Sequence, residues 1–318
     1  MTTSTPSATP TRSAGPAAAL RRMRHQSPGD LAFAAFVGVA LTAVVFATLY
    51  PIWFVAIASV SAPDLVQSGQ VLLFPRGVNS FGYEQIFADA RIWQGYRNTL
   101  TYAVVGTAIN MLVTIPAAYA LSRREFRARR VLIFFFAFTM FFNGGLIPNY
   151  LLYRDLGLLN TMWVFVLPTA LNVYNLIIAR AFFEHSLPEE LHEAAFIDGA
   201  SYFQVFTRMV IPLSKPILSV ILLYYLVAHW NDFFTGLVFI RDADLQPLQV
   251  VLRDILLSNN VFAGGAGGAG GTGGGYGQQF ADQIKYGVIV VSTLPVVVLY
   301  PFLQKYFEKG VLIGSVKG

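Results

Sequence analysis

A set of polar and aromatic side chains that could bind a solute lies within or at the ends of long apolar stretches. The set is Asn143, Asn172, Asn175, Tyr225, Trp230, Asn231 and Asp232. Amides and carboxylates hydrogen-bond to hydroxyl groups, and aromatic faces pack on C–H groups, so these residue types suit a sugar-like solute. Because polar groups are costly inside a membrane, they are candidates for a solute pathway. The alternative is that they join helices or anchor them at the interface.

Covalent chemistry is not indicated. The sequence contains no P-loop, no HExxH and no GxSxG pattern, and it has no cysteine. Its four histidines are scattered without metal-ligand spacing. We therefore expect no catalytic residue, no metal site and no cofactor bound by this chain.

Composition predicts an all-α integral membrane protein. Of 318 residues, 55% are hydrophobic and 12% are charged, and this charged share is about half that of a soluble domain. Residues 1–28 are rich in Thr, Ser, Pro and Ala and are predicted to be a disordered tail before a transmembrane domain at 29–318. We expect six membrane spans in this domain, at about 31–60, 96–121, 131–152, 161–183, 217–240 and 284–307. Between the last two spans, the glycine-rich segment 263–277 is predicted to be a flexible exterior insert.

The segment 186–216 is the longest stretch outside the apolar spans with the signals of ordered helix. Ser186 and Glu189 have the spacing of a capping box, which predicts a helix that begins beside them. This helix should reach about Ile197, because Gly199 can adopt the left-handed conformation that ends a helix. The segment is acidic, so anionic lipid would repel it, and a protein partner explains it better than a membrane surface does.

A second helix is predicted directly after this turn. Ser201 and Gln204 repeat the capping-box spacing, and Pro212 and Pro216 should interrupt the helix before the next apolar run. The result is a helix, a turn and a second helix that leads into the membrane.

The same residues resemble the EAA loop of bacterial ABC-importer permeases. That pattern is EAA, three residues, G, nine residues and I-x-L-P. Here Glu193-Ala194-Ala195 and Gly199 are followed by Met209-x-Ile211-Pro212, with Met for Ile and Ile for Leu. The resemblance extends from about Leu31 to Gly318. It covers the binding-protein-dependent, MetI-like permeases of the carbohydrate branch, in the subgroup that includes polysaccharide and oligosaccharide importers.

This resemblance implies a membrane subunit that couples ATP hydrolysis in another polypeptide to solute uptake. The implied partners are a second, different permease subunit, two cytoplasmic ATPase subunits that hold ATP and Mg²⁺, and an extracellular solute-binding protein; lipid surrounds the spans, and no nucleic acid is expected. The residues implied to couple to the ATPase are Glu193, Ala194, Ala195, Asp198, Gly199 and Pro212.

The basic residues predict the orientation. Most of the 22 Lys and Arg residues fall on one side if the N-terminus is placed inside, which puts both termini and the 186–216 loop in the cytoplasm of a bacterial cell. The basic run 123–130 is explained by topology and lipid headgroups. A secondary, ion-coupled transporter is the alternative function, but it predicts intramembrane carboxylates and an internal repeat, which the sequence does not show.

Overall fold

The computed structural model describes residues 27–264, 283–298 and 301, and within these the regular elements are helical. The predicted tail up to residue 26 and the glycine-rich insert from residue 265 onward lie outside the described residues. The chain divides into two compact units, Met1–Phe54 and Val55–Gly318. Each is described by itself.

The first unit is formed by most of helix α2 (Pro28–Ala58). Ser27 and Asp30 exchange backbone-to-side-chain hydrogen bonds at its start, as a capping pair does. With 31 residues, the helix is about 46 Å long and exceeds the thickness of a bilayer core. Its apolar side chains are exposed all round, which is expected of a helix that faces lipid. It coincides with the first predicted span.

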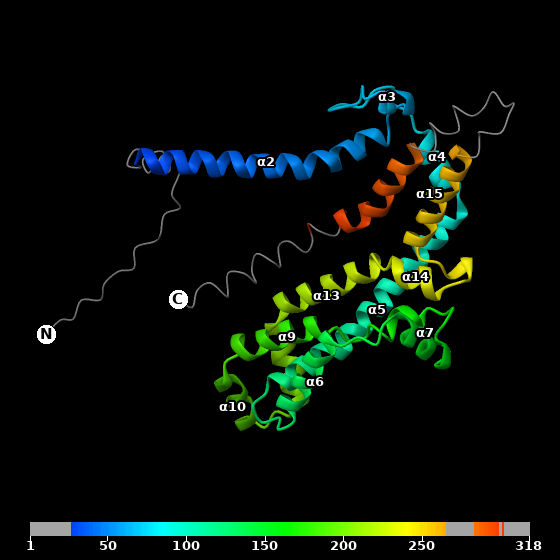
Figure 1. Ribbon diagram of the computed structural model, residues 1–318. Coiled ribbons are helices and arrows are strands. Elements are labelled where there is room, and N and C mark those ends of the chain that lie inside the picture. The colour runs from blue at the N-terminus through cyan, green and yellow to red at the C-terminus, as the bar shows by residue number, and fades with distance from the viewer. Residues whose placement is uncertain (1–26, 265–282, 299–300, 302–318) are drawn as a thin grey trace. The chain divides into compact units, whose positions relative to one another are not determined.

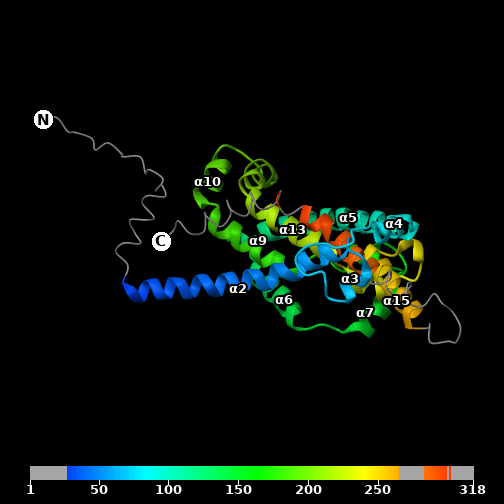
Figure 2. The same ribbon diagram turned by 90° about the horizontal axis from the view of Figure 1, so that it is seen from above.

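The second unit is built around helix α5 (Ala90–Ser122). Helices α13 (Lys215–Trp230), α9 (Val173–Ser186) and α15 (Leu248–Gly264) all pack on it, and α13 runs alongside α5 (Figures 1 and 2). The buried face of α5 carries amides and hydroxyls among its apolar side chains. The central helix therefore meets its neighbours through both apolar packing and hydrogen bonds.

The remaining elements of this unit are shorter. They are α3 (Pro63–Gln67), α4 (Phe81–Ala88), α6 (Arg129–Phe141), α7 (Leu146–Asp155), α8 (Trp163–Val166), α10 (Glu189–Ile197), α11 (Tyr202–Val205), the π-helical turn η1 (Phe206–Val210), α12 (Ile211–Leu213), α14 (Phe233–Phe239), the 3₁₀ turn η2 (Ala243–Leu245) and the helix Gln283–Val298. In both views, α10 lies at one end of the unit, and α4 and α15 lie at the other (Figures 1 and 2).

Several predicted spans are broken in the structure. The span at 131–152 is divided into α6 and α7, which meet at 116°, and the span at 161–183 is interrupted between α8 and α9. The span at 217–240 is interrupted between α13 and α14. Within the described residues, two helices are long and apolar enough to cross a membrane, or up to four if each bent pair is one span. The count of six spans stays a prediction.

Helix α15 was not predicted. The residues between the predicted spans 217–240 and 284–307 are expected to be exterior loop, yet they include a helix that ends at Gly264, inside the predicted glycine-rich insert. Its apolar face packs on the start of α5, where Gly95 allows close approach: a methyl group on Gly95 would lie 3.0 Å from the Cα of Leu248. Burial of this face against α5 holds the segment in a helix that its position in a loop did not suggest.

Helix α13 packs closely against α5 at Gly106. A methyl group on this glycine would lie 2.4 Å from Nε2 of the buried His229 ring, a distance at which something must move. Small residues at such contacts let the helices of membrane proteins pack closely.

We expect Gly106→Ala to destabilise the protein by about 1–3 kcal/mol, because the added methyl group overpacks the α5–α13 contact. The matched control is Gly38→Ala in α2, where an added methyl group meets nothing within 4 Å. Thermal unfolding of the purified chain in detergent measures both. An unchanged melting temperature for Gly106→Ala would show that the α5–α13 contact is looser than the structure indicates.

Candidate functional site

The 186–216 loop begins differently from the prediction. Helix α9 continues through Ser186, and α10 starts at Glu189 with Pro188 as its N-cap and no side-chain capping bond. The predicted Ser186–Glu189 capping box is therefore wrong. The serine belongs to the preceding helix, and Pro188 replaces it because proline has no N–H that needs a cap.

The end of α10 is as predicted. Gly199 has φ +78°, and the amides of Gly199 and Ala200 donate to the carbonyls of Phe196 and Ala195, which is the Schellman arrangement. Ser201 and Gln204 then form the predicted capping box at the start of α11. These reciprocal bonds fix the turn between the two helices.

The two faces of α10 differ. His192 and Ala195 are buried, at 2% and 6% exposure, against the chain itself, whereas Glu193, Ala194 and Asp198 are exposed. Ala195 belongs to the apolar cluster that joins α5, α9 and α13. The resemblance implied that Ala194 and Ala195 both couple to the ATPase. In the structure, the Ala195 methyl group packs in the core and Ala194 lies on the surface.

Basic side chains tie α10 to the end of α5. Nη2 of Arg123 lies 3.2 Å from Oε1 of Glu189 and 3.1 Å from Oε1 of Glu125. The Arg123 side chain is only 15% exposed, so the pair is better shielded from solvent than an ordinary surface ion pair, which contributes little. Nearby, Nε of Arg180 donates to the carbonyl of Leu121. The basic run after α5 thus has a structural role beyond topology.

The loop leaves toward the membrane through a bend. Pro212 has no N–H to donate to the carbonyl of Arg208, four residues earlier, and the chain before it forms the π-helical turn Phe206–Val210. The helices Tyr202–Leu213 and Lys215–Trp230 meet at 82°. The predicted interruption of this helix is confirmed.

Most of the candidate pathway residues have partners inside the protein. Oδ1 of Asn172 caps α9 by accepting from the Asn175 amide at 3.1 Å, and Oδ1 of Asp232 caps α14 by accepting from the Thr235 amide at 3.1 Å. Asn175 itself is buried in the first turn of α9. The Asn172 and Asp232 side chains therefore serve helix starts, and Asn175 takes part through its backbone N–H.

Two of the candidates bridge helices. The Tyr225 hydroxyl accepts from the backbone N–H of Asn172 at 3.0 Å and lies 2.6 Å from Oγ1 of Thr114. Nε1 of Trp230 donates to the carbonyl of Ser292 at 3.1 Å. Asn143, Asn172 and Asn231 are the exposed members of the predicted set, and Nδ2 of Asn231 donates to the Val227 carbonyl.

Helix α5 supplies side chains to backbone carbonyls in segments that are not α-helical. Nδ2 of Asn98 donates to the carbonyls of Asp244 and Gln246 at 2.7 and 2.9 Å. The Tyr102 hydroxyl donates to the Leu245 carbonyl at 2.9 Å. Further along α5, Nδ2 of Asn110 donates to the Thr169 carbonyl, and Oδ1 of Asn110 lies 2.7 Å from Nε2 of His229. Sequence analysis missed these residues because each belongs to a long apolar helix without a motif.

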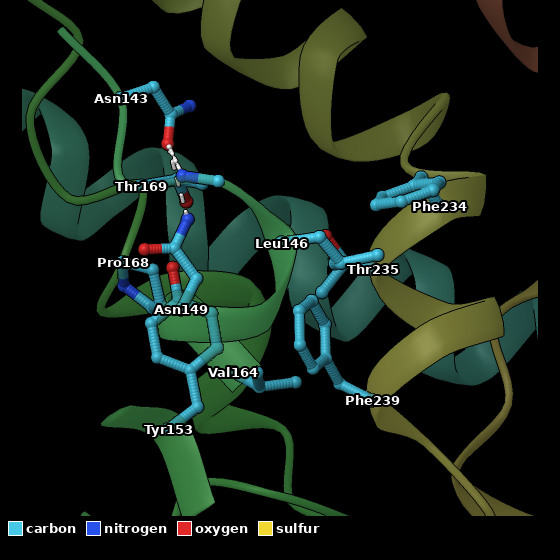
Figure 3. Close-up of a pocket in the computed structure, with 11 residues that line it drawn as sticks. Asn143, Leu146, Asn149, Tyr153, Val164, Pro168, Thr169, Phe234, Thr235 and Phe239 are labelled. Carbon is cyan, nitrogen blue, oxygen red and sulfur yellow. Dashed lines mark hydrogen bonds between the residues drawn. The ribbon is translucent and has the colours of Figure 1, made fainter. Parts of the chain in front are cut away.

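A cavity of about 260 Å³ lies between the broken helices and α14. In Figure 3, residues of the α7–α8 region face Phe234, Thr235 and Phe239 of α14 across it. The lining combines amides and hydroxyls with aromatic rings: Asn143, Gly145, Leu146, Asn149, Tyr153, Val164, Pro168, Thr169, Phe234, Thr235 and Phe239. Asn143 is the one predicted pathway residue among them. In the sequence, two helix-breaking stretches, Asn143-Gly144-Gly145 and Pro168, could have indicated that a cavity forms at the breaks.

The chain is similar to known transport proteins over most of its length. Residues 92–313 match the family described as "Binding-protein-dependent transport system inner membrane component". Protein LplC of Bacillus subtilis (strain 168) is 39% identical over 85% of this chain and 90% of its own. The polygalacturonan/rhamnogalacturonan transport system permease protein YtcP of the same organism is 40% identical over 84% and 92%.

A solved structure has the same fold. The crystal structure of a bacterial ABC transporter involved in the import of the acidic polysaccharide alginate contains a chain that matches with a TM-score of 0.80 and 35% identity. The match covers 89% of this chain and 99% of that one.

Tyr225→Phe should lower the stability by about 1–2 kcal/mol, because it leaves the half-buried backbone N–H of Asn172 and the buried Thr114 hydroxyl without a partner. Thermal unfolding in detergent measures the loss. The neighbouring Tyr224→Phe is the matched control, since Tyr224 is 41% exposed. Equal melting temperatures for the two variants would contradict the bridging role.

Acidification should loosen α10. Burial, first, and then the positive charge of Arg123 lower the pKa of His192, against weaker opposing effects of the Pro188 carbonyl, Glu189 and Glu125. The folded state therefore favours the neutral ring, whose Nδ1 lies 3.3 Å from the Pro188 carbonyl. This contribution to stability is present above the ordinary pKa of about 6.5 and is lost as the pH falls below it.

Hydrogen exchange of the α10 amides at pH 7.5 and pH 5.5 tests this expectation. Exchange should be faster at the lower pH after correction for intrinsic rates, and His192→Asn, which retains a donor toward Pro188, should reduce the difference. His185→Asn, an exposed histidine at the end of α9, serves as the control. A pH effect that survives in His192→Asn would assign it to another group.

Proposed function

The chain belongs to the family of binding-protein-dependent transport system inner membrane components and is a permease subunit of an ABC importer rather than an enzyme, and from this premise we propose that it imports a carbohydrate. The polygalacturonan/rhamnogalacturonan transport system permease protein YtcP, which is 40% identical over most of the chain, and a solved alginate importer of the same fold support the solute class. The exposed face of α10 supports the coupling role.

Helix α10 is the proposed docking element for a cytoplasmic ATPase. Its buried face, its Schellman turn and the Arg123–Glu189 ion pair fix it to the ends of α5 and α13. Its outer face presents Glu193, Ala194 and Asp198. Because the helix is held stiffly, a force applied to this face reaches the membrane helices instead of deforming the loop. Glu193 would supply a charge-assisted hydrogen bond to the ATPase.

The rest of the assembly follows from this role. We propose a second, different permease subunit beside this chain, two ATPase subunits that bind ATP and Mg²⁺, and an extracellular solute-binding protein. In this arrangement the chain crosses the bacterial cytoplasmic membrane six times, with both termini and the α10 loop in the cytoplasm. ATP binding would turn the spans outward, and hydrolysis would return them inward.

The exposed position of Glu193 allows a clean test. Glu193→Lys removes a charge-assisted hydrogen bond of about 1.5–3 kcal/mol and should lower uptake about tenfold or more. Folding should be unchanged, because Glu193 is exposed and has no hydrogen bond or ion pair within the described part of the chain. Uptake and ATP hydrolysis are measured with the complete transporter in proteoliposomes.

Asp64→Lys is the matched control, since it makes the same change of charge on α3, far from α10 in the sequence and also exposed. It should transport normally. Full uptake by Glu193→Lys would remove α10 as the coupling element. Equal losses in both variants would indicate a general effect of charge.

A further inference from the structure

The cavity between α7 and α14 has the features of a solute subsite. We propose that it binds one uncharged sugar ring of the transported solute, an inference that rests on the proposed function as a carbohydrate permease. Its volume of about 260 Å³ is just below the range of roughly 300–1,000 Å³ for sites that enclose a drug-sized ligand. It therefore fits one ring better than a longer stretch of chain.

Both breaks in the helical backbone open onto this cavity. The break between α6 and α7 contributes Asn143 and Gly145, and the break between α8 and α9 contributes Pro168 and Thr169. At membrane depth, backbone that is not helical is tolerated only where it is buried in protein or lines a water-filled cavity. In transporters, discontinuous helices are the usual builders of solute sites.

Each break is held rigid by side chains. Oδ1 of Asn143 accepts from the Gly145 amide at 2.9 Å and faces Nδ2 of Asn149 at 3.5 Å (Figure 3), which leaves the Asn143 NH₂ group for a ligand hydroxyl. On the other side, Asn110 holds the Thr169 carbonyl. The Thr169 hydroxyl donates to the Phe165 carbonyl at 2.7 Å and still has lone pairs to accept from a ligand.

Aromatic rings form the remaining walls. The rings of Tyr153 and Phe239 meet edge to face at 5.2 Å, and Phe234 lies on the α14 side in Figure 3. Such rings pack well on the C–H groups of a sugar. A site with converging amides and hydroxyls and with aromatic walls orients a polyhydroxylated ring through both kinds of contact.

The lining contains no Asp, Glu, Lys, Arg or His among the described residues that form it. A carboxylate that entered this cavity would lose its hydration without gaining a counter-charge, and this is strongly unfavourable. The site therefore prefers a neutral ring to a uronic acid. The preference is a property of this cavity alone, and an acidic polymer would have to be accommodated elsewhere in the path.

Because the chain has no native cysteine, a single cysteine can report on the cavity. In membranes that contain the complete transporter, Thr169→Cys is labelled with a fluorescent maleimide in the presence of cellobiose, maltose, melibiose or digalacturonate. At about ten times its dissociation constant a ligand fills roughly nine-tenths of the sites, so at least one neutral disaccharide should slow labelling about tenfold. Digalacturonate should not.

The matched control is Thr139→Cys in α6. Thr139 is exposed, its hydroxyl also donates to a backbone carbonyl of its own helix, and it does not line the cavity. Its labelling should not respond to any sugar. Phe234→Leu, added to Thr169→Cys, should weaken the protection, because it keeps an apolar side chain but removes an aromatic wall. Phe234 is 55% exposed, so the substitution should not affect folding.

The outcomes separate the subsite from the proposed function. Absence of protection by every neutral sugar, or stronger protection by digalacturonate, would overturn the subsite. Full ATP-dependent carbohydrate uptake by the transporter after maleimide has modified Thr169→Cys would overturn it as well, while the proposed function stands. If the unmodified transporter takes up no carbohydrate with ATP, the proposed function itself fails.

Discussion

The constraint on which this structure depends is that backbone groups outside a helix must find partners within the protein when no water is near. Helix α5 meets this constraint for its neighbours. Asn98, Tyr102 and Thr99 bond to the turn at 244–248, and Asn110 bonds to the break after α8. Because one helix supplies all of these groups, it fixes the positions of segments that lie far apart in the sequence. The turn before α15 and the break beside the cavity are held by these polar side chains of α5.

The same helix joins α10 to the cavity between α7 and α14. Its last turns share an apolar cluster with α9, α10 and α13, and the ion pairs of Arg123 continue this contact to Glu189. Further along, Asn110 and Gly106 hold His229 of α13, and Asn110 also holds the backbone beside the cavity. A displacement of α10 would therefore move α5 and α13 together. In the proposed coupling role, this stiffness would let a movement of α10 reach the cavity lined by Asn143 and Thr169.

Sequence reasoning succeeded where a signal was local. The left-handed Gly199, the Ser201–Gln204 capping box and the bend near Pro212 each depend on a few neighbouring residues, and each is present. It failed where the result depends on distant residues. The spacing of Ser186 and Glu189 satisfied the capping rule, but packing of α9 carries that helix through Ser186. Helix α15 is a different case: Leu248, Val251, Leu252 and Ile255 have helical spacing and are buried in the cluster beside Gly95 of α5, so a local signal was present and the prediction missed it.

The candidate pathway residues show why polarity inside apolar stretches is an ambiguous signal. A carboxylate or amide at membrane depth can serve a solute or a helix start, and the sequence looks the same in both cases. Asn172 and Asp232 each accept a hydrogen bond from an amide three residues later, so backbone capping already uses them. Asn143 also accepts from backbone, but only at Oδ1, and it retains a donor group beside a cavity. The residues best suited to a solute are therefore those whose hydrogen-bonding capacity the fold has not used, and they can be recognised only after the backbone has been accounted for.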